Sequence, residues 1–129
     1  MGYLTRTLGE ITFAPPLTHA ETTAWIVGRD DLFAFDINAT ETETPDGRLI
    51  AYSAHRITCR YENPTTKAYN ARGDLQAICD HVKGRTFSGC ILLLGEESGD
   101  VRRLVVDSRG EVHEEKALLT WPDGSAVIL

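Results

Sequence analysis

Carboxylates gather most densely in the turn Gly95–Asp100, where Glu96, Glu97 and Asp100 lie within five positions. Hard cations such as Mg²⁺ and Ca²⁺ prefer carboxylate oxygens as ligands. The helix–loop–helix calcium sites spread their ligands over about twelve residues, however, and this segment is too short to match them. We therefore interpret it as a solvated hairpin turn whose three acidic residues are weak candidate cation ligands.

His113 has the most suggestive neighbours among the histidines, because Glu114 and Glu115 follow it directly. Side chains alternate along a strand, so His113 and Glu115 are expected on one face and Glu114 on the other. A histidine beside a carboxylate has the groups of a general base or a metal ligand. A zinc site needs three or four converging protein ligands, and this pair supplies two. The pair is therefore a weak candidate metal site.

Other chemistry-bearing residues are scattered. Cys59, Cys79 and Cys90 each lie in an apolar run and form no Cys-x-x-Cys pair, which indicates buried, reduced thiols. No Gly-x-Ser-x-Gly elbow and no phosphate-binding glycine loop is present. The sequence therefore predicts no catalytic residue and no cofactor. The other histidines fall in a predicted strand (His55) and in predicted helices (His19 and His81).

Composition limits the classes of function. The 129 residues fit a single globular domain over 1–129, and the net charge of -6 comes without any block of basic residues. Nucleic-acid backbone binding relies on clustered lysine and arginine, so it is disfavoured. The first ten residues include Arg6 and Glu10 and no apolar stretch, and no segment reaches the ~20 apolar residues of a membrane span. We expect a cytoplasmic protein.

The elements that would position these residues are clearest near the C-terminus. Three apolar runs, Phe87–Leu94, Val101–Val106 and Val112–Trp121, are separated by two short clusters of turn-forming residues. Strands joined by such short connections are antiparallel neighbours. Pro122-Asp-Gly124 is expected to end the last strand.

The N-terminal segment predicts a strand and a short helix. Tyr3–Phe13 is the first expected strand, in which Gly9 marks a bulge or a close backbone approach. Pro15-Pro16 should end it, because proline cannot donate to a sheet. Thr18 and Glu21 have the spacing of a capping box, which predicts a helix to about Val27; weak helix formers over 22–28 leave its length open.

The middle of the chain predicts a hairpin. Two-residue periodicity begins at Leu32 and places four residues on one face: Phe33, Phe35, Ile37 and Ala39. Thr40–Thr44 is polar on both faces and is expected to fray into solvent. Pro45-Asp-Gly47 predicts the turn, Leu49–Arg60 the return strand and Asn63–Thr66 a loop.

A second helix is predicted from Thr66 or Asp74 to Lys83, with Gly84 as its C-cap. Its apolar residues recur at the spacing of one buried stripe: Leu75, Ile78, Cys79 and Val82. The predicted fold is therefore α+β, with two helices on one face of a largely antiparallel sheet. A ferredoxin-like βαββαβ core extended by a C-terminal hairpin is the first choice, and a helix packed on a curled sheet is the alternative.

Both ends of the chain carry a resemblance. The segments Gly2–Thr18, Gly84–Asp100 and Trp121–Gly124 resemble an uncharacterised family of small proteins from Streptomyces-type actinobacteria and their phages. The likeness covers about half of the chain. It implies a cytosolic setting in such organisms, supplies no chemistry and carries over no functional residue.

These observations favour a non-enzymatic accessory protein that binds a protein partner or its own copy, since a small strand-rich domain has sheet edges that can pair. The alternative is a binder of a small molecule or divalent cation, or a modest enzyme. Its site would lie on the open sheet face or at the Glu96–Asp100 turn. Nucleic-acid binding ranks last, because the charge opposes it.

Overall fold

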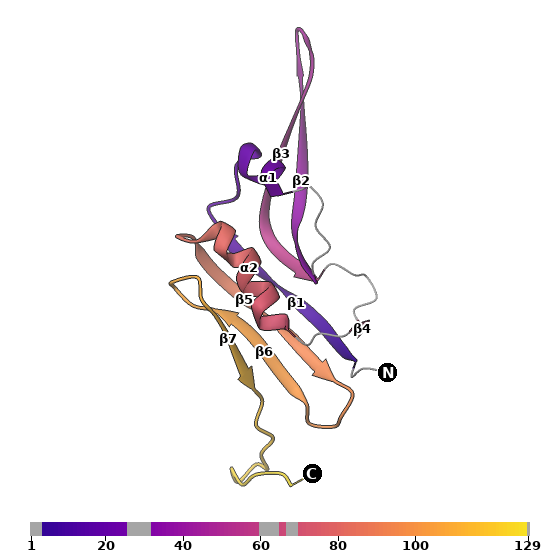
Figure 1. Cartoon of the computed structure of the whole chain (residues 1–129), viewed down its shortest axis with the longest axis vertical. Helices are drawn as coiled ribbons and strands as arrows, with labels where there is room; N and C mark the ends of the chain where they lie inside the picture. The colour runs from indigo at the N-terminus through magenta and orange to yellow at the C-terminus, as the bar shows by residue number, and fades with distance from the viewer. Residues whose placement is uncertain (1–3, 26–31, 60–64, 67–69, 129) are drawn as a thin grey trace.

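The computed structural model describes residues 4–25, 32–59, 65–66 and 70–128, which form one antiparallel sheet with two helices (Figure 1). The elements in chain order are β1 (Thr5–Ala14), α1 (His19–Trp25), β2 (Phe33–Thr44), β3 (Gly47–Cys59), β4 (Thr65–Thr66), α2 (Ala71–Cys79), a 3₁₀ turn (Asp80–Val82), β5 (Thr86–Gly95), β6 (Val101–Val106) and β7 (Val112–Lys116).

The strands lie in the order β2-β3-β1-β5-β6-β7, and every neighbouring pair is antiparallel. The short strand β4 pairs with the start of β1. The α+β class and the antiparallel meander of the last three strands are thus confirmed. The predicted loop Asn63–Thr66 is wrong at its end, because Thr65 and Thr66 pair with Arg6 and Thr5.

β1 and β5 form the longest uninterrupted pairing at the centre of the sheet, and two glycines allow it. Gly9 has a φ of +99°, and a Cβ atom there would lie 2.5 Å from the carbonyl oxygen of Cys90. Gly89 makes the reciprocal approach, 2.6 Å from the carbonyl oxygen of Glu10. The close backbone approach predicted at Gly9 is confirmed.

One face of the sheet and the two helices enclose a single core. Its buried residues are Ile11, Phe13, Leu17, Trp25, Phe33, Phe35, Ala54, Ile57, Ala71, Leu75, Ile78, Cys79, Val82, Ile91, Leu93, Leu104 and Val112. α2 contacts both β7 and β2, so it crosses the sheet (Figure 1). Trp25 of α1 packs edge-on against His81 after α2, with ring centroids 4.5 Å apart. Both helices therefore share one core.

The apolar stripe predicted for the second helix is confirmed, because all four of its residues are buried. The α-helix itself is shorter than predicted. It begins at Ala71 with Asn70 as N-cap, so Asp74 lies in the first turn, and it tightens into a 3₁₀ turn after Cys79. Gly84 follows with a φ of +88°, as expected of a glycine that ends a helix.

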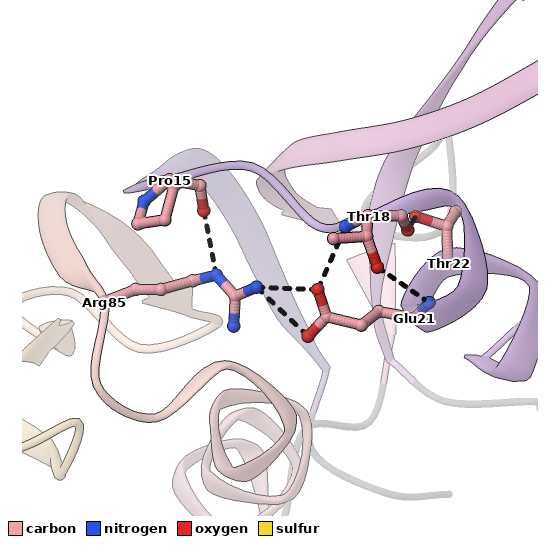
Figure 2. A network of polar contacts seen from close by, with 5 residues as sticks. All are labelled: Pro15, Thr18, Glu21, Thr22 and Arg85. Atoms are coloured by element: carbon pink, nitrogen blue, oxygen red, sulfur yellow. Dashed lines mark hydrogen bonds and ion pairs between the residues drawn. The ribbon is translucent and has the colours of Figure 1, made fainter.

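The start of α1 is fixed by the predicted capping box (Figure 2). The backbone N–H of Glu21 donates to Thr18 Oγ1 at 3.2 Å, and the N–H of Thr18 donates to Glu21 Oε1 at 3.0 Å. Arg85, from the connection between α2 and β5, donates to both Glu21 oxygens and to the carbonyl oxygen of Pro15 at 2.8 Å. The predicted end of this helix near Val27 lies outside the described residues.

The β2–β3 hairpin extends well beyond the body of the sheet (Figure 1). Phe33 and Phe35 are buried and Ile37 packs against the core, but β2 is exposed from Ala39 to its end. The expected fraying of Thr40–Thr44 is wrong, because pairing continues to Thr44 opposite Gly47. The turn at Pro45-Asp-Gly47 holds the two strands in register, although the residues on both sides of it, Ala39–Thr44 and Gly47–Ala51, are exposed.

The last strand is shorter than the apolar run Val112–Trp121 predicted. β7 ends at Lys116, and the final bond to the sheet runs from the N–H of Ala117 to the carbonyl oxygen of Val101, at 2.8 Å. Val101 is the first residue of β6, so the neighbouring strand offers nothing further to pair with. The length of β7 is set by its partner strand.

Candidate functional site

Residues 117–128 leave the sheet and form a separate small hairpin at the end of the molecule, here called the C-terminal arm (Figure 1). The N–H of Trp121 donates to Ser125 at 2.8 Å, and the N–H of Val127 donates to Leu119 at 3.0 Å. Asp123 accepts from the N–H and the hydroxyl of Ser125, and Gly124 adopts a φ of +87°. The predicted turn at Pro122-Asp-Gly124 therefore closes a hairpin of its own.

The arm exposes large apolar side chains. Leu118 is 85% exposed, Trp121 58% and Ile128 94%, and Leu119 is also exposed. Exposed apolar residues that occur singly are ordinary, but several of them on one short segment are typical of an interaction surface. Trp121 therefore lies on the arm, outside the core.

A hollow of about 420 Å³ lies where the arm meets the sheet. It is lined by Gly99, Lys116, Ala117, Leu118, Leu119, Thr120, Gly124, Ala126 and Val127. These residues are mostly apolar and carry one charged side chain, Lys116. Such a surface has the composition of a docking site for apolar side chains.

The sheet face opposite the helices is the second place where a site was expected. One row of opposed residues crosses it from Leu8 through Leu92 and Arg103 to Glu115. A smaller hollow of about 270 Å³ includes Leu92, Val101 and Arg103 in its lining. Arg103 donates to both Glu115 oxygens at 3.3 and 3.4 Å, so the candidate Glu115 serves a cross-strand ion pair.

In the contacts that the structure describes, the carboxylates of the acidic turn Gly95–Asp100 do not converge on one site. Glu96 Oε1 accepts from the backbone N–H of Leu4 at 3.0 Å. Asp100 Oδ1 accepts from Arg102 Nε at 3.1 Å, and Arg102 also donates to Glu114 at 2.8 Å. Glu97 contributes its carbonyl oxygen to the N–H of Asp100. These contacts are those of a hairpin connection held between two strands.

His113 meets a different carboxylate from the one its neighbours suggested. Its Nε2 lies 2.7 Å from Asp107 Oδ2, across the turn between β6 and β7. In the described part of the chain, Asp107, Glu111 and His113 bring one potential ligand atom each within 4.8 Å of one another. Three converging donors are the minimum for a metal site with open positions.

Asp107 owes its place to the turn. Its Oδ1 accepts from the N–H groups of Arg109 and Glu111, and Gly110 supplies the positive φ that closes the loop. The hydrogen bond from His113 and these two N–H groups lower the pKa of Asp107 to about 2. Sequence reasoning treated Asp107 only as a turn former; the signal available was an aspartate six residues before a histidine across a tight turn.

The cysteines are not placed for chemistry. All three are free thiols, with Cys79 buried and Cys59 and Cys90 half-buried. Burial raises the pKa of the Cys79 thiol to about 12, which removes its thiolate at neutral pH. Burial also raises the pKa of Cys59. The expectation of burial is met in full only at Cys79.

His19 and His81 lie in or beside helices, and each is exposed and in contact with an aromatic side chain. His19 accepts from the N–H of Tyr52 at 2.9 Å and stacks on its ring, and His81 packs edge-on against Trp25. His55 is exposed on β3.

In the part of the chain that the structure describes, no helix is long and apolar enough to cross a membrane. Comparison with curated proteins and with solved structures found no match to this sequence. A family model does match, and it spans residues 1–129. The chain belongs to a family of unknown function, DUF6205.

Proposed function

We propose that this protein is a non-enzymatic accessory protein that binds another protein chain through its C-terminal arm. The exposure of Leu118, Trp121 and Ile128 outside the core carries the proposal. The arm is built as a hairpin with its own hydrogen bonds, so it presents these side chains in a defined arrangement. Tryptophan is among the residues that most often carry the binding energy of protein interfaces.

The structure of the arm also suggests why a protein, not a small ligand, is the partner. Its apolar side chains surround an open hollow and project from a hairpin with exposed tips, whereas small-molecule sites enclose most of their ligand. The projecting β2–β3 hairpin adds a second uncovered surface, with Leu49 and Ile50 exposed. Isolated two-stranded hairpins are marginal in water, so a covering partner would stabilise the arm.

Affinity capture with the double variant Leu118→Ser/Trp121→Ser tests the proposal. Tagged wild-type protein should retain one stoichiometric partner from a lysate of the source organism, and the arm variant should lose it. The matched control is Leu49→Ser, which removes an apolar side chain of equal exposure to Trp121 (58%) from the other projection. An unchanged partner in the arm variant, or no partner over several hosts, would refute the role of the arm.

The biological setting that we propose follows from the resemblance of both ends of the chain to small proteins of actinobacteria and their phages. We place the protein in the cytoplasm of actinobacteria or their phages, with a role in phage–host conflict such as inhibition of a defence component. The lysates for the capture experiment are therefore actinobacterial. Membership of a family without known function is compatible with this setting.

The convergence of Asp107, Glu111 and His113 favours a second candidate function, binding of a divalent cation. One nitrogen and two carboxylate donors suit Zn²⁺ or Mn²⁺. A thermal-shift titration with each metal tests it, because ligand binding to the native state raises apparent stability. A shift abolished by His113→Ala supports this function, and an equal shift in both proteins or none in either refutes it.

We further propose that the core is ferredoxin-like. The strand order β2-β3-β1-β5 supports it, with α1 between β1 and β2 and α2 between β3 and β5. The hairpin of β6 and β7 would then be the extension. An experimental structure should show two right-handed crossovers through α1 and α2, and a left-handed one would contradict this arrangement.

A further inference from the structure

β7 is the last strand of the sheet, and its hydrogen-bonding directions can be assigned residue by residue. The carbonyl oxygen of Glu111 and the N–H of Ala117 bond inward, to Asp107 and Val101 of the adjoining segment. Backbone groups alternate along an antiparallel strand, so His113 and Glu115 also bond inward. The residues between them therefore direct their N–H and C=O groups outward: Val112, Glu114 and Lys116.

Side chains of α2 occupy the outer edge at one of these three positions. Gln76 accepts from the N–H of Val112 at 2.8 Å, and Arg72 donates to the carbonyl oxygen of Val112 at 3.4 Å. No other strand of the described chain pairs with β7 on this side. The part of the edge that α2 leaves open is the stretch from Glu114 to Lys116, directly before the C-terminal arm.

We propose that a second copy of this chain pairs with the outer edge of β7 in antiparallel fashion, around a two-fold axis at Glu115. Only residues with outward groups bond across such a pair, so Glu114 faces Lys116 of the second copy and Lys116 faces Glu114. Opposite charges directly across two strands are stabilising. The stretch is thus complementary in charge to itself.

The remaining residues are compatible with this register. Glu115 would face Glu115 of the second copy. Each glutamate already forms an ion pair with Arg103 of its own chain, on the adjacent strand β6. At Val112 the side chains of Gln76 and Arg72 already occupy the edge, so the pairing ends before Leu118 and the arm of each copy leaves the strand direction after Lys116.

The opposite edge of the sheet, strand β2, is not complementary in charge to itself. β2 carries Asp36, Glu41 and Glu43 and no lysine or arginine over Phe33–Thr44. Pairing two copies of β2 would bring carboxylates together with no cation from either strand. Charges of one sign on an edge strand oppose such pairing, so β7 is the edge that a second copy would use.

This inference rests on the proposed function, because it names a second copy as one occupant of the surface near the arm. Strand pairing over so few residues buries little area. The dimer therefore depends on the arms as well, since a stable interface needs on the order of 1,000 Å² in total. Trp121 and the exposed leucines of both arms supply the apolar part of that area.

Charge reversal combined with mass measurement in solution tests the pairing. Sedimentation equilibrium should give the wild-type chain a mass of twice its 14.3 kDa. Glu114→Lys or Lys116→Glu, each by itself, should weaken the dimer by roughly tenfold or more, because two attractive pairs become repulsive. An equimolar mixture of the two variants should form the heterodimer, since a lysine then faces a glutamate at both cross-strand pairs.

Controls separate this outcome from loss of folding. Circular dichroism should show each variant folded, and Glu43→Lys, which reverses an acidic charge on β2, should leave the dimer intact. Lys116→Pro is a second variant that removes an outward N–H and should give a folded monomer. A monomeric wild type, or a mixture that does not recombine, would overturn the pairing. Partner capture through the arm would be unaffected by that result, so the proposed function is judged separately.

Discussion

The junction around Arg85 and the C-terminal arm are two small regions with opposite relations to the rest of the molecule. Arg85, whose side chain is only 14% exposed, joins the start of α1, the loop at Pro15 and the approach to β5 through charged hydrogen bonds (Figure 2). Beyond Ala117, the hydrogen bonds that the structure describes for the arm lie within it, and the arm exposes Leu118 and Trp121. The first region stabilises the fold, and the second is available to another chain.

The largest expected difference in unfolding free energy comes from replacing a leucine by alanine in the buried core and, separately, on the arm. Leu75→Ala should lower the free energy of unfolding by about 2–5 kcal/mol, because Leu75 is fully buried in the core. Leu118→Ala should change it by less than about 0.5 kcal/mol. Chemical denaturation measures both, and a comparable loss at Leu118 would mean that the arm belongs to the folded core.

The junction itself is broken by Arg85→Ala. This change removes the partner of Glu21 and of the Pro15 carbonyl, so we expect a loss of roughly 1–3 kcal/mol in unfolding free energy. The matched control is Arg103→Ala, which breaks a more exposed ion pair and should cost less than about 1 kcal/mol. Equal effects at the two arginines would contradict a special role for the junction.

Acid should protonate the carboxylates that accept hydrogen bonds, and the stabilisation that they give to the fold should then be lost. The N–H of Thr18 and the guanidinium of Arg85 lower the pKa of Glu21, and His113 lowers the pKa of Asp107 to about 2. Both groups are deprotonated more readily in the folded state. Their stabilisation is therefore complete above the ordinary pKa of the unfolded chain, near ~4, and is lost as the pH falls through the lowered pKa of each group, which is about 2 for Asp107.

The variants Glu21→Gln and Asp107→Asn measure these two contributions. Each should flatten the decline in unfolding free energy between about pH 5 and 2 relative to wild type. Asp123→Asn is the control within the arm, where the pKa of Asp123 is lowered by Ser125, and it should alter only the arm. A decline as steep in Glu21→Gln as in wild type would show that the junction does not depend on the charge of Glu21.

The smallest effect on stability is expected from removing the arm. A chain ending at Lys116 loses the bond from Ala117 to Val101 and the hairpin beyond it. We expect the melting temperature to shift by only a few degrees, because no core residue of the described chain lies after Val112. Calorimetry checks this, and a chain that fails to fold would show that the arm contributes to the sheet.

Predictions that depend on local interactions were confirmed. The Thr18–Glu21 capping box formed because its donors and acceptors lie within one helical turn. The stripe of α2 was readable because burial on one helical face requires a fixed spacing. The approach at Gly9 involves the distant residue Cys90, but it was predictable from Gly9 alone, because a glycine in a strand often accompanies close contact with a neighbouring backbone.

Predictions that depend on distant partners were less complete. The run Val112–Trp121 is apolar enough for a long strand, but β6 begins at Val101 and leaves Ala117 at the end of the ladder. The fraying predicted for Thr40–Thr44 was wrong, because the sequence does not show how far the pairing of this segment with β3 continues. The contact between His113 and Asp107 needed the register of two strands, which carboxylate spacing does not give.

The start of α1, the turns, the buried stripe of α2 and the antiparallel meander were specified by the residue order alone, because each follows from interactions among residues close along the chain. The open edge of the sheet and the end of β7 were specified only by the assembled fold. The same holds for the positions of Leu118 and Trp121 outside the core. Burial depends on which strands and helices reach a side chain, and those neighbours come from distant parts of the sequence.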